Sequence, residues 1–179
     1  MNPDTATHLR RGPSAAGTVR QVAVPPSARA LSTLSRIDYE DAFLVQTGRL
    51  VQSRTGEQWA RAVLEGAPIR TRSALLAGWS ALGLRLGSPR SDRFVLGWEV
   101  PRSTPDVALL AAGSRLGMPA EVLFKRQQDT LLFATFVRHE NQIVRAVWAG
   151  VAPGHRQVVQ RLLEGAGCLT SAGGAAVAT

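Results

Sequence analysis

The spacing of hydrophobic and polar residues changes several times along the chain, and each change predicts a different element. Hydrophobic residues alternate with others over residues 37–48, which predicts a first strand in which Tyr39 and Asp41 share one face. Hydrophobic residues recur every three or four positions after the capping pattern of Thr55–Gln58, and again over residues 73–86. The first part of the pattern therefore predicts one strand followed by two helices.

The second half of the chain predicts several strands and then one long helix. The strands are expected at residues 94–100, 107–112, 121–126 and 131–139. The turn residues between them favour an antiparallel meander. Residues 143–165 carry an apolar stripe typical of a long amphipathic helix, with a kink expected at Pro153. This order of elements predicts an α+β fold.

The two ends of the chain lack such patterns. Residues 1–35 are rich in Pro, Ala, Ser, Thr and Arg, and we interpret them as a flexible arm. Residues 168–179 are mostly small, and their hydrophobic and polar positions follow no regular spacing. We interpret them as a disordered tail. Residues 36–167 would then form a single domain. A chain of 179 residues that is 45% hydrophobic is long enough to bury a core there.

The composition narrows the class of partner. The chain has 21 basic and 13 acidic residues, a formal net charge of +8, and Lys125 is its single lysine. A bias to arginine, alanine and glycine is typical of a GC-rich genome, so the charge does not require an anionic partner. The basic residues form no clustered stripe, and nucleic-acid binding is therefore not favoured.

Other classes of site are not indicated by the sequence. The single cysteine, Cys168, allows no disulfide framework, and His8, His139 and His155 do not have metal-ligand spacing. The glycines form no dinucleotide or phosphate loop, so no cofactor is expected. No apolar run is long enough to span a membrane and no signal core appears, which predicts a cytoplasmic protein.

The predicted order of elements resembles that of the helix-grip (SRPBCC) superfamily, which includes START lipid-transfer domains, polyketide cyclases and birch-pollen-allergen-like proteins. Within it, the chain is most similar to a bacterial domain of unknown function that in some members follows a reductase-like, nicotinamide-binding domain. The residues that carry this similarity are Asn141, Arg145, Trp148, Pro153, His155, Arg156 and the run 158–163, together with the opening run 38–43. Val144 and Gly154 depart from the family pattern.

The resemblance implies a curved antiparallel sheet wrapped around the C-terminal helix, with a ligand cavity between them. It also implies a cofactor-independent enzyme of the cyclase, dehydratase or isomerase type that acts on an apolar, polyketide-like substrate by acid–base chemistry. A non-catalytic carrier or sensor of a hydrophobic molecule needs only the same cavity, so it stays open as the alternative. The sequence also leaves open whether the chain forms a homodimer.

Three residues are candidate acids or bases. Glu99 follows Trp98 in an apolar strand, where burial would raise its pKa, although the same alternation also fits a solvent-facing position. His139 closes the last strand, and both faces of that strand are apolar, so the sequence does not say which face contacts the helix. His155 lies on the apolar stripe of the last helix, where it would serve either proton transfer or the carbonyl groups freed by Pro153.

The remaining candidates would contact the substrate or ligand. Tyr39, Asp41 and Arg138 could hydrogen-bond a carbonyl or enolate oxygen, although solvent-exposed side chains would look the same in the sequence. The tryptophans would suit a flat ligand, although packing in the core explains them equally. The predicted ligand contacts are Tyr39, Asp41, Trp59, Trp79, Trp98, Phe136, Arg138 and Trp148, and no metal ligand is expected.

Overall fold

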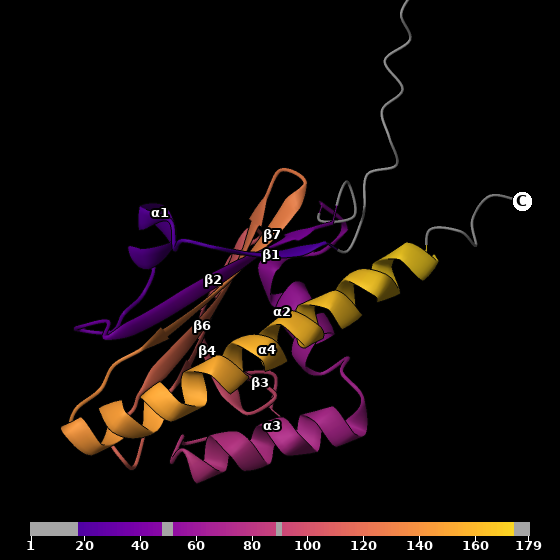
Figure 1. Ribbon diagram of the computed structural model, residues 1–179. Helices are drawn as coiled ribbons and strands as arrows, with labels where there is room; N and C mark the ends of the chain where they lie inside the picture. The colour runs from indigo at the N-terminus through magenta and orange to yellow at the C-terminus, as the bar shows by residue number, and fades with distance from the viewer. Residues whose placement is uncertain (1–17, 48–51, 89–90, 174–179) are drawn as a thin grey trace, which may run out of the picture.

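The computed structural model describes residues 18–47, 52–88 and 91–173. This part of the chain has an α+β architecture in which one antiparallel sheet is crossed by a long C-terminal helix (Figure 1). The arrangement is consistent with the helix-grip fold that the resemblance implies.

The described residues form a sheet of seven strands in the order β1-β2-β7-β6-β5-β4-β3, with every neighbouring pair antiparallel. The strands are β1 (Val19–Val22), β2 (Tyr39–Gln46), β3 (Phe94–Val95), β4 (Trp98–Ser103), β5 (Val107–Ala112), β6 (Ala120–Gln127) and β7 (Thr130–Val137). From β3 to β7 each strand lies beside the one before it in the sequence, which confirms the predicted meander. The first predicted strand, β2, pairs along its whole length with β7.

The helices are α1 (Pro26–Arg29), α2 (Gly56–Leu64), α3 (Ile69–Ala81) and α4 (Gln142–Gly173). The predicted capping box of α2 is confirmed: the Gln58 amide donates to Thr55 Oγ1 at 3.2 Å, and the Thr55 amide donates to Gln58 Oε1 at 2.8 Å. The helix α3 begins at Ile69, earlier than predicted, because Pro68 sits at its N-cap, where its fixed φ suits a helix start.

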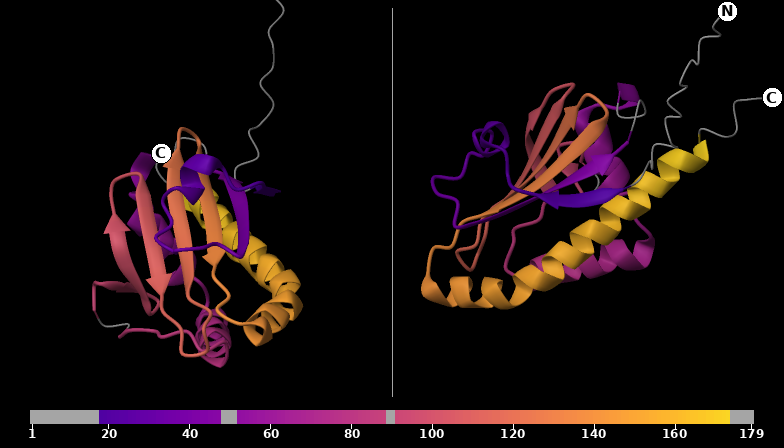
Figure 2. Two further views of the ribbon diagram at one scale, coloured as in Figure 1. Left: turned by 90° about the vertical axis from the view of Figure 1, so that its left-hand side faces the viewer. Right: turned by 45° about the horizontal axis from the view of Figure 1, so that its top comes forward.

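The helix α4 runs without interruption through Pro153. The right-hand view of Figure 2 shows that the helix bends within its first half. A proline there has no N–H for the carbonyl group four residues earlier, and this loss is a common cause of bending. The Asn141 side chain starts the helix, because its Oδ1 accepts from the Val144 amide at 2.9 Å.

The two faces of the sheet carry separate hydrophobic cores. On one face, alternate residues of β7 such as Phe133 and Val137 pack with α2 and α4. On the other face, Leu132, Ala134 and Phe136 pack beneath the segment 22–37. The helices α1 and α4 accordingly lie on opposite faces of the sheet (Figure 2).

The ordered N-terminal segment corrects the prediction of a flexible arm over residues 1–35. From residue 18 onwards the chain is structured: β1 pairs with β2, and Ala28 of α1 is fully buried. The apolar residues that hold this segment on the sheet follow no helical or strand period, so the sequence pattern did not reveal them. Residues 1–17 lie outside the described residues.

The C-terminal boundary also differs from the prediction. The helix α4 continues to Gly173, past the expected limit at residue 167. Residues 168–173 therefore belong to a helix and not to a disordered tail, and residues 174–179 lie outside the described residues.

A tight hairpin replaces the single strand predicted for residues 94–100. Phe94 pairs with Glu99 and Val95 with Trp98, so the two residues between them form the turn. Leu96 and Gly97 have φ of 47° and 88°, the left-handed values that a two-residue hairpin turn of the type I′ class needs. A leucine in the first turn position gave no turn signal, and the expected alternation across residues 94–100 is therefore wrong.

Candidate functional site

A cavity of about 330 Å³ lies between one face of the sheet, α3 and α4. Its walls are mostly aliphatic and aromatic side chains. Apart from the tryptophans, the lining side chains that carry polar atoms are Thr135 and His155. The volume falls at the lower end of the range for small-molecule sites, about 300–1,000 Å³. The cavity is therefore apolar, with polar groups gathered at one place.

Four side chains form a polar cluster at that place. The Tyr39 hydroxyl donates to Asp41 Oδ2 at 2.6 Å. His155 Nε2 lies 3.3 Å from the same carboxylate oxygen and 3.2 Å from Thr135 Oγ1. The Asp41 side chain is 2% exposed, so this carboxylate is buried.

Strand register and helical spacing bring the cluster together. Asp41 on β2 lies directly opposite Thr135 on β7, and Tyr39 precedes Asp41 by one strand repeat. His155 follows Trp148 by two turns of α4, and the two rings lie 5.3 Å apart. Trp148 also packs edge-on against Tyr39 at 5.0 Å. The cluster therefore joins the sheet to the long helix.

The surroundings set the charge states of two of these groups. Burial raises the pKa of Asp41, but the hydrogen bonds and charge of His155, with the hydrogen bonds of Tyr39 and Thr135, outweigh burial and hold it below its ordinary value. The pKa of Tyr39 is raised, first by burial and then by the hydrogen bond to Asp41. At neutral pH the site thus contains an ionised carboxylate that accepts from a neutral phenol.

Three of the four tryptophans line the cavity: Trp79, Trp98 and Trp148. Trp79 and Trp98 pack edge to face with ring centres 5.4 Å apart. The indole N–H groups of Trp98 and Trp148 are buried, and no hydrogen-bond acceptor faces them in the described part of the structure. The remaining tryptophan, Trp59, is buried in the core behind the cavity wall, where Arg54 packs on its ring.

Two of the candidate residues, Glu99 and Phe136, do not line the cavity. Glu99 is exposed on β4, where it forms an ion pair with Arg93 at 3.2 Å, so the solvent-facing interpretation holds and it does not reach the cavity. Phe136 belongs to the second core, opposite α4, and does not line the cavity. The register of β7 decides this, because Phe136 has the opposite orientation to Thr135.

The last two candidates lie just beyond the end of β7. The Arg138 guanidinium donates to Ser35 Oγ at 2.7 Å and pairs with Glu140, outside the cavity. His139 is buried, and its ring lies 6.5 Å from that of Trp148, but it is not a lining residue. Desolvation is the main cause that lowers the pKa of His139. The structure therefore unites His155, Tyr39 and Asp41, and keeps His139 behind Trp148.

The sequence analysis did not select Thr135 as a site residue. Thr135 is 3% exposed and contacts His155. It is the one polar residue between Leu131 and Val137 in an otherwise apolar strand, and that interruption is the signal that could have identified it. The sequence left open which face of β7 meets the helix α4. In the structure the face that carries Thr135 meets α4, and this brings Thr135 into the cluster.

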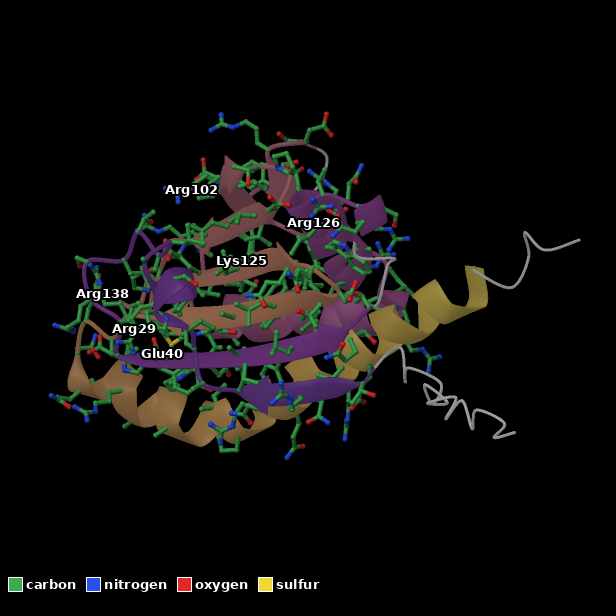
Figure 3. The ribbon with its side chains drawn as sticks, turned by 90° about the horizontal axis from the view of Figure 1, so that it is seen from above. Arg29, Glu40, Arg102, Lys125, Arg126 and Arg138 are labelled. Atoms are coloured by element: carbon green, nitrogen blue, oxygen red, sulfur yellow. The ribbon has the colours of Figure 1, made fainter. Side chains whose placement is uncertain are left out.

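The outer face of the sheet carries basic side chains from several elements (Figure 3). Arg29 points toward Glu40 and pairs with it. Arg126 shares the opposite face of β6 with Phe124, a residue of the core that packs with α2 and α4, and it pairs with Asp106. Lys125 Nζ donates to Ser27 Oγ at 3.3 Å. Basic side chains on this face, such as Arg29 and Lys125, therefore already have partners within the protein.

Metal-ligating side chains do not gather in threes anywhere in the described ranges 18–47, 52–88 and 91–173. Among the helices of these same ranges, none combines the length and apolar character that crossing a membrane requires.

Comparison of the chain with protein-family models, with curated proteins and with solved structures found no match.

Proposed function

We propose that the protein binds a small apolar molecule in the cavity between the sheet and α4, and that His155 transfers a proton to or from it. One observation carries the proposal: the ionisable side chain that lines this apolar cavity, His155, lies 3.3 Å from a buried carboxylate, that of Asp41. The order of elements and the cavity also support membership of the helix-grip superfamily.

The geometry supports general acid–base chemistry. In the tautomer in which His155 Nε2 carries the proton, Nε2–H faces Asp41 Oδ2 and Thr135 Oγ1, and the lone pair of Nδ1 is left to accept a proton. Asp41 holds the ring in this orientation, and its negative charge stabilises the imidazolium that forms. An apolar cavity keeps competing water away from the reacting atoms. This chemistry suits proton removal next to a carbonyl group, the step shared by cyclisation, dehydration and isomerisation.

Binding can be tested by filling the cavity. Gly154 lines the cavity, and a Cβ built there meets no atom within 4 Å, so Gly154→Leu should fold normally and occupy ligand space. We expect it to weaken binding of the uncharged fluorescent probe N-phenyl-1-naphthylamine at least about tenfold. Gly150→Leu, on the same helix but outside the cavity, is the matched control and should bind as the wild type does. Equal affinities in all three proteins would overturn the proposed site.

Catalysis can be tested with a substrate that needs only a base. The ring opening of 5-nitrobenzisoxazole by proton removal suits an apolar cavity, and we expect His155→Gln to lower kcat/KM by a factor of about 10² or more. His139→Gln is the matched control, because His139 is buried outside the cavity, and it should keep the activity.

The carrier or sensor remains the second candidate, because almost the whole lining is apolar. Tight probe binding together with equal, background-level ring opening in the wild type and in His155→Gln would favour the carrier and exclude His155 as a base.

A further inference from the structure

A second hollow of about 770 Å³ lies beside the cavity, between the start of α3 and the C-terminal half of α4. We call it the side groove. The side groove and the cavity share lining residues from three helices: Val63, Ala74, Leu75, Val158 and Leu162. Because the same side chains line both spaces, the cavity and the side groove are neighbours, and a ligand that passed between these side chains would occupy both.

The side groove differs from the cavity in charge. Arg70, in the first turn of α3, and Arg161, on α4, both line it, and no acidic residue does. Both arginines are exposed, and no ion pair joins either of them to another described residue. Two unpaired guanidinium groups at one groove favour an anion there.

The acidic residues nearest in sequence have other partners. Glu65 accepts from the Leu96 amide at 3.1 Å and lies 3.4 Å from Arg61. Glu164 accepts from the Gln160 side chain at 2.9 Å. The groove therefore keeps its positive charge within the described structure.

The start of α3 adds to this charge. Its N-cap residue, Pro68, makes no side-chain capping hydrogen bond, and its first turn contains no acidic residue. The free amides and the positive end of the helix dipole therefore point out of α3 beside Arg70.

We infer that the side groove holds the anionic group of the ligand whose apolar part lies in the cavity, so that the natural ligand is an amphipathic acid with a carboxylate at one end. This inference rests on the proposed binding function. Arg70 and Arg161 would then be specificity-determining residues, since they contact the carboxylate and not the apolar body.

Two probes with the same apolar chain test the inference: decanoate and 1-decanol, each measured by displacement of N-phenyl-1-naphthylamine. We expect Arg70→Gln and Arg161→Gln each to weaken decanoate binding about three- to tenfold and to leave decanol binding unchanged. Added salt should weaken decanoate binding more than decanol binding. Arg145→Gln removes the same charge from an exposed position on α4 outside both hollows, and it should change neither affinity.

The outcomes separate the two proposals. If decanol and decanoate both bind and the arginine substitutions affect them equally, or affect neither, the ligand is not held by these arginines and the inference fails while the binding function stands. If Arg145→Gln weakens decanoate as much as Arg161→Gln does, the effect is one of net charge and the inference fails as well. If the dye binds the wild type but neither decanol nor decanoate displaces it, the inference fails while the binding function stands. If the dye binds the wild type and Gly154→Leu equally, the proposed binding function fails and the inference fails with it.

Discussion

At the scale of single residues, the most informative group is the buried carboxylate of Asp41. It accepts from the Tyr39 hydroxyl and lies within reach of His155, while its other oxygen, Oδ1, is buried with no partner in the described structure. A buried carboxylate with an unused acceptor site is costly unless its ionised form is well stabilised. Its lowered pKa indicates that the neighbouring donors provide that stabilisation.

The lowered pKa of Asp41 predicts how stability depends on pH. A carboxyl group whose folded pKa is depressed contributes stability above its unfolded pKa, about 3.9, and loses that contribution as the pH falls through the folded value. We therefore expect Asp41→Asn to unfold more easily than the wild type near pH 7, with a difference that shrinks below about pH 4. Urea unfolding of both proteins across this range measures it. A difference in unfolding free energy that is constant with pH would show that the charge of Asp41 does not contribute to stability.

At the scale of elements, the packing of α2 on the sheet depends on a glycine. Gly56 is the first residue of α2 and is buried. A Cβ at this position would lie 2.7 Å from the Ala108 amide nitrogen and 2.8 Å from the Val107 carbonyl carbon, both backbone atoms of β5. Because a strand backbone cannot move without breaking its ladder, α2 reaches this close only with glycine there.

Two glycine substitutions in helices should therefore have opposite signs. We expect Gly56→Ala to lower the free energy of unfolding by more than about 1 kcal/mol, because α2 must move away from β5. Gly150→Ala, in the exposed interior of α4 with no atom near its Cβ, should raise it by up to about 1 kcal/mol through helix propensity. Thermal and urea unfolding of the two variants measures both. A stabilising Gly56→Ala would contradict the close approach of α2 to β5.

At the scale of the whole molecule, the sheet is covered on both faces. The helices α2 and α4 pack on one face, and the segment 22–37 covers the other. Glu121 of β6 holds this segment on the sheet by hydrogen bonds. Its side chain is 1% exposed and accepts from Ser32 Oγ at 2.5 Å and from the Thr33 amide at 3.1 Å. The far face of the sheet is thus closed by a segment that is distant in sequence from the strands it covers.

Loss of the hydrogen bonds of Glu121 should destabilise the segment 22–37 more than the rest of the protein. We expect Glu121→Ala to lower the free energy of unfolding by about 1–3 kcal/mol, because the donors of Ser32 and Thr33 lose their buried acceptor. Hydrogen exchange should become faster over residues 22–37 and stay slow in α2. Glu99→Ala is the control, since Glu99 is exposed. Exchange that is unchanged over residues 22–37 would mean that apolar contacts alone hold the segment.

Much of the architecture could be predicted from the sequence, because it depends on local signals. The capping box predicted α2, the alternation of 37–48 placed Tyr39 and Asp41 on one face, and the apolar stripe placed His155 with Trp148 on the inner side of α4. Each of these patterns is set by hydrogen bonding or side-chain direction within one element, so the residues themselves contain the information.

The site could be predicted only in part, because it depends on contacts between elements. Both faces of β7 are apolar, and only the packing of α4 decides that Thr135 faces His155 while Phe136 faces the N-terminal segment. The turn at Leu96 and Gly97 could not be recognised, because leucine adopts positive φ only where tertiary packing outweighs its local cost. In this protein the sequence alone determined most of the elements from β2 to α4 and the inner faces of β2 and α4, since these follow from local periodicity. The tertiary structure alone decided which polar groups meet at the cavity, because register and helix docking set distances between residues far apart in the chain.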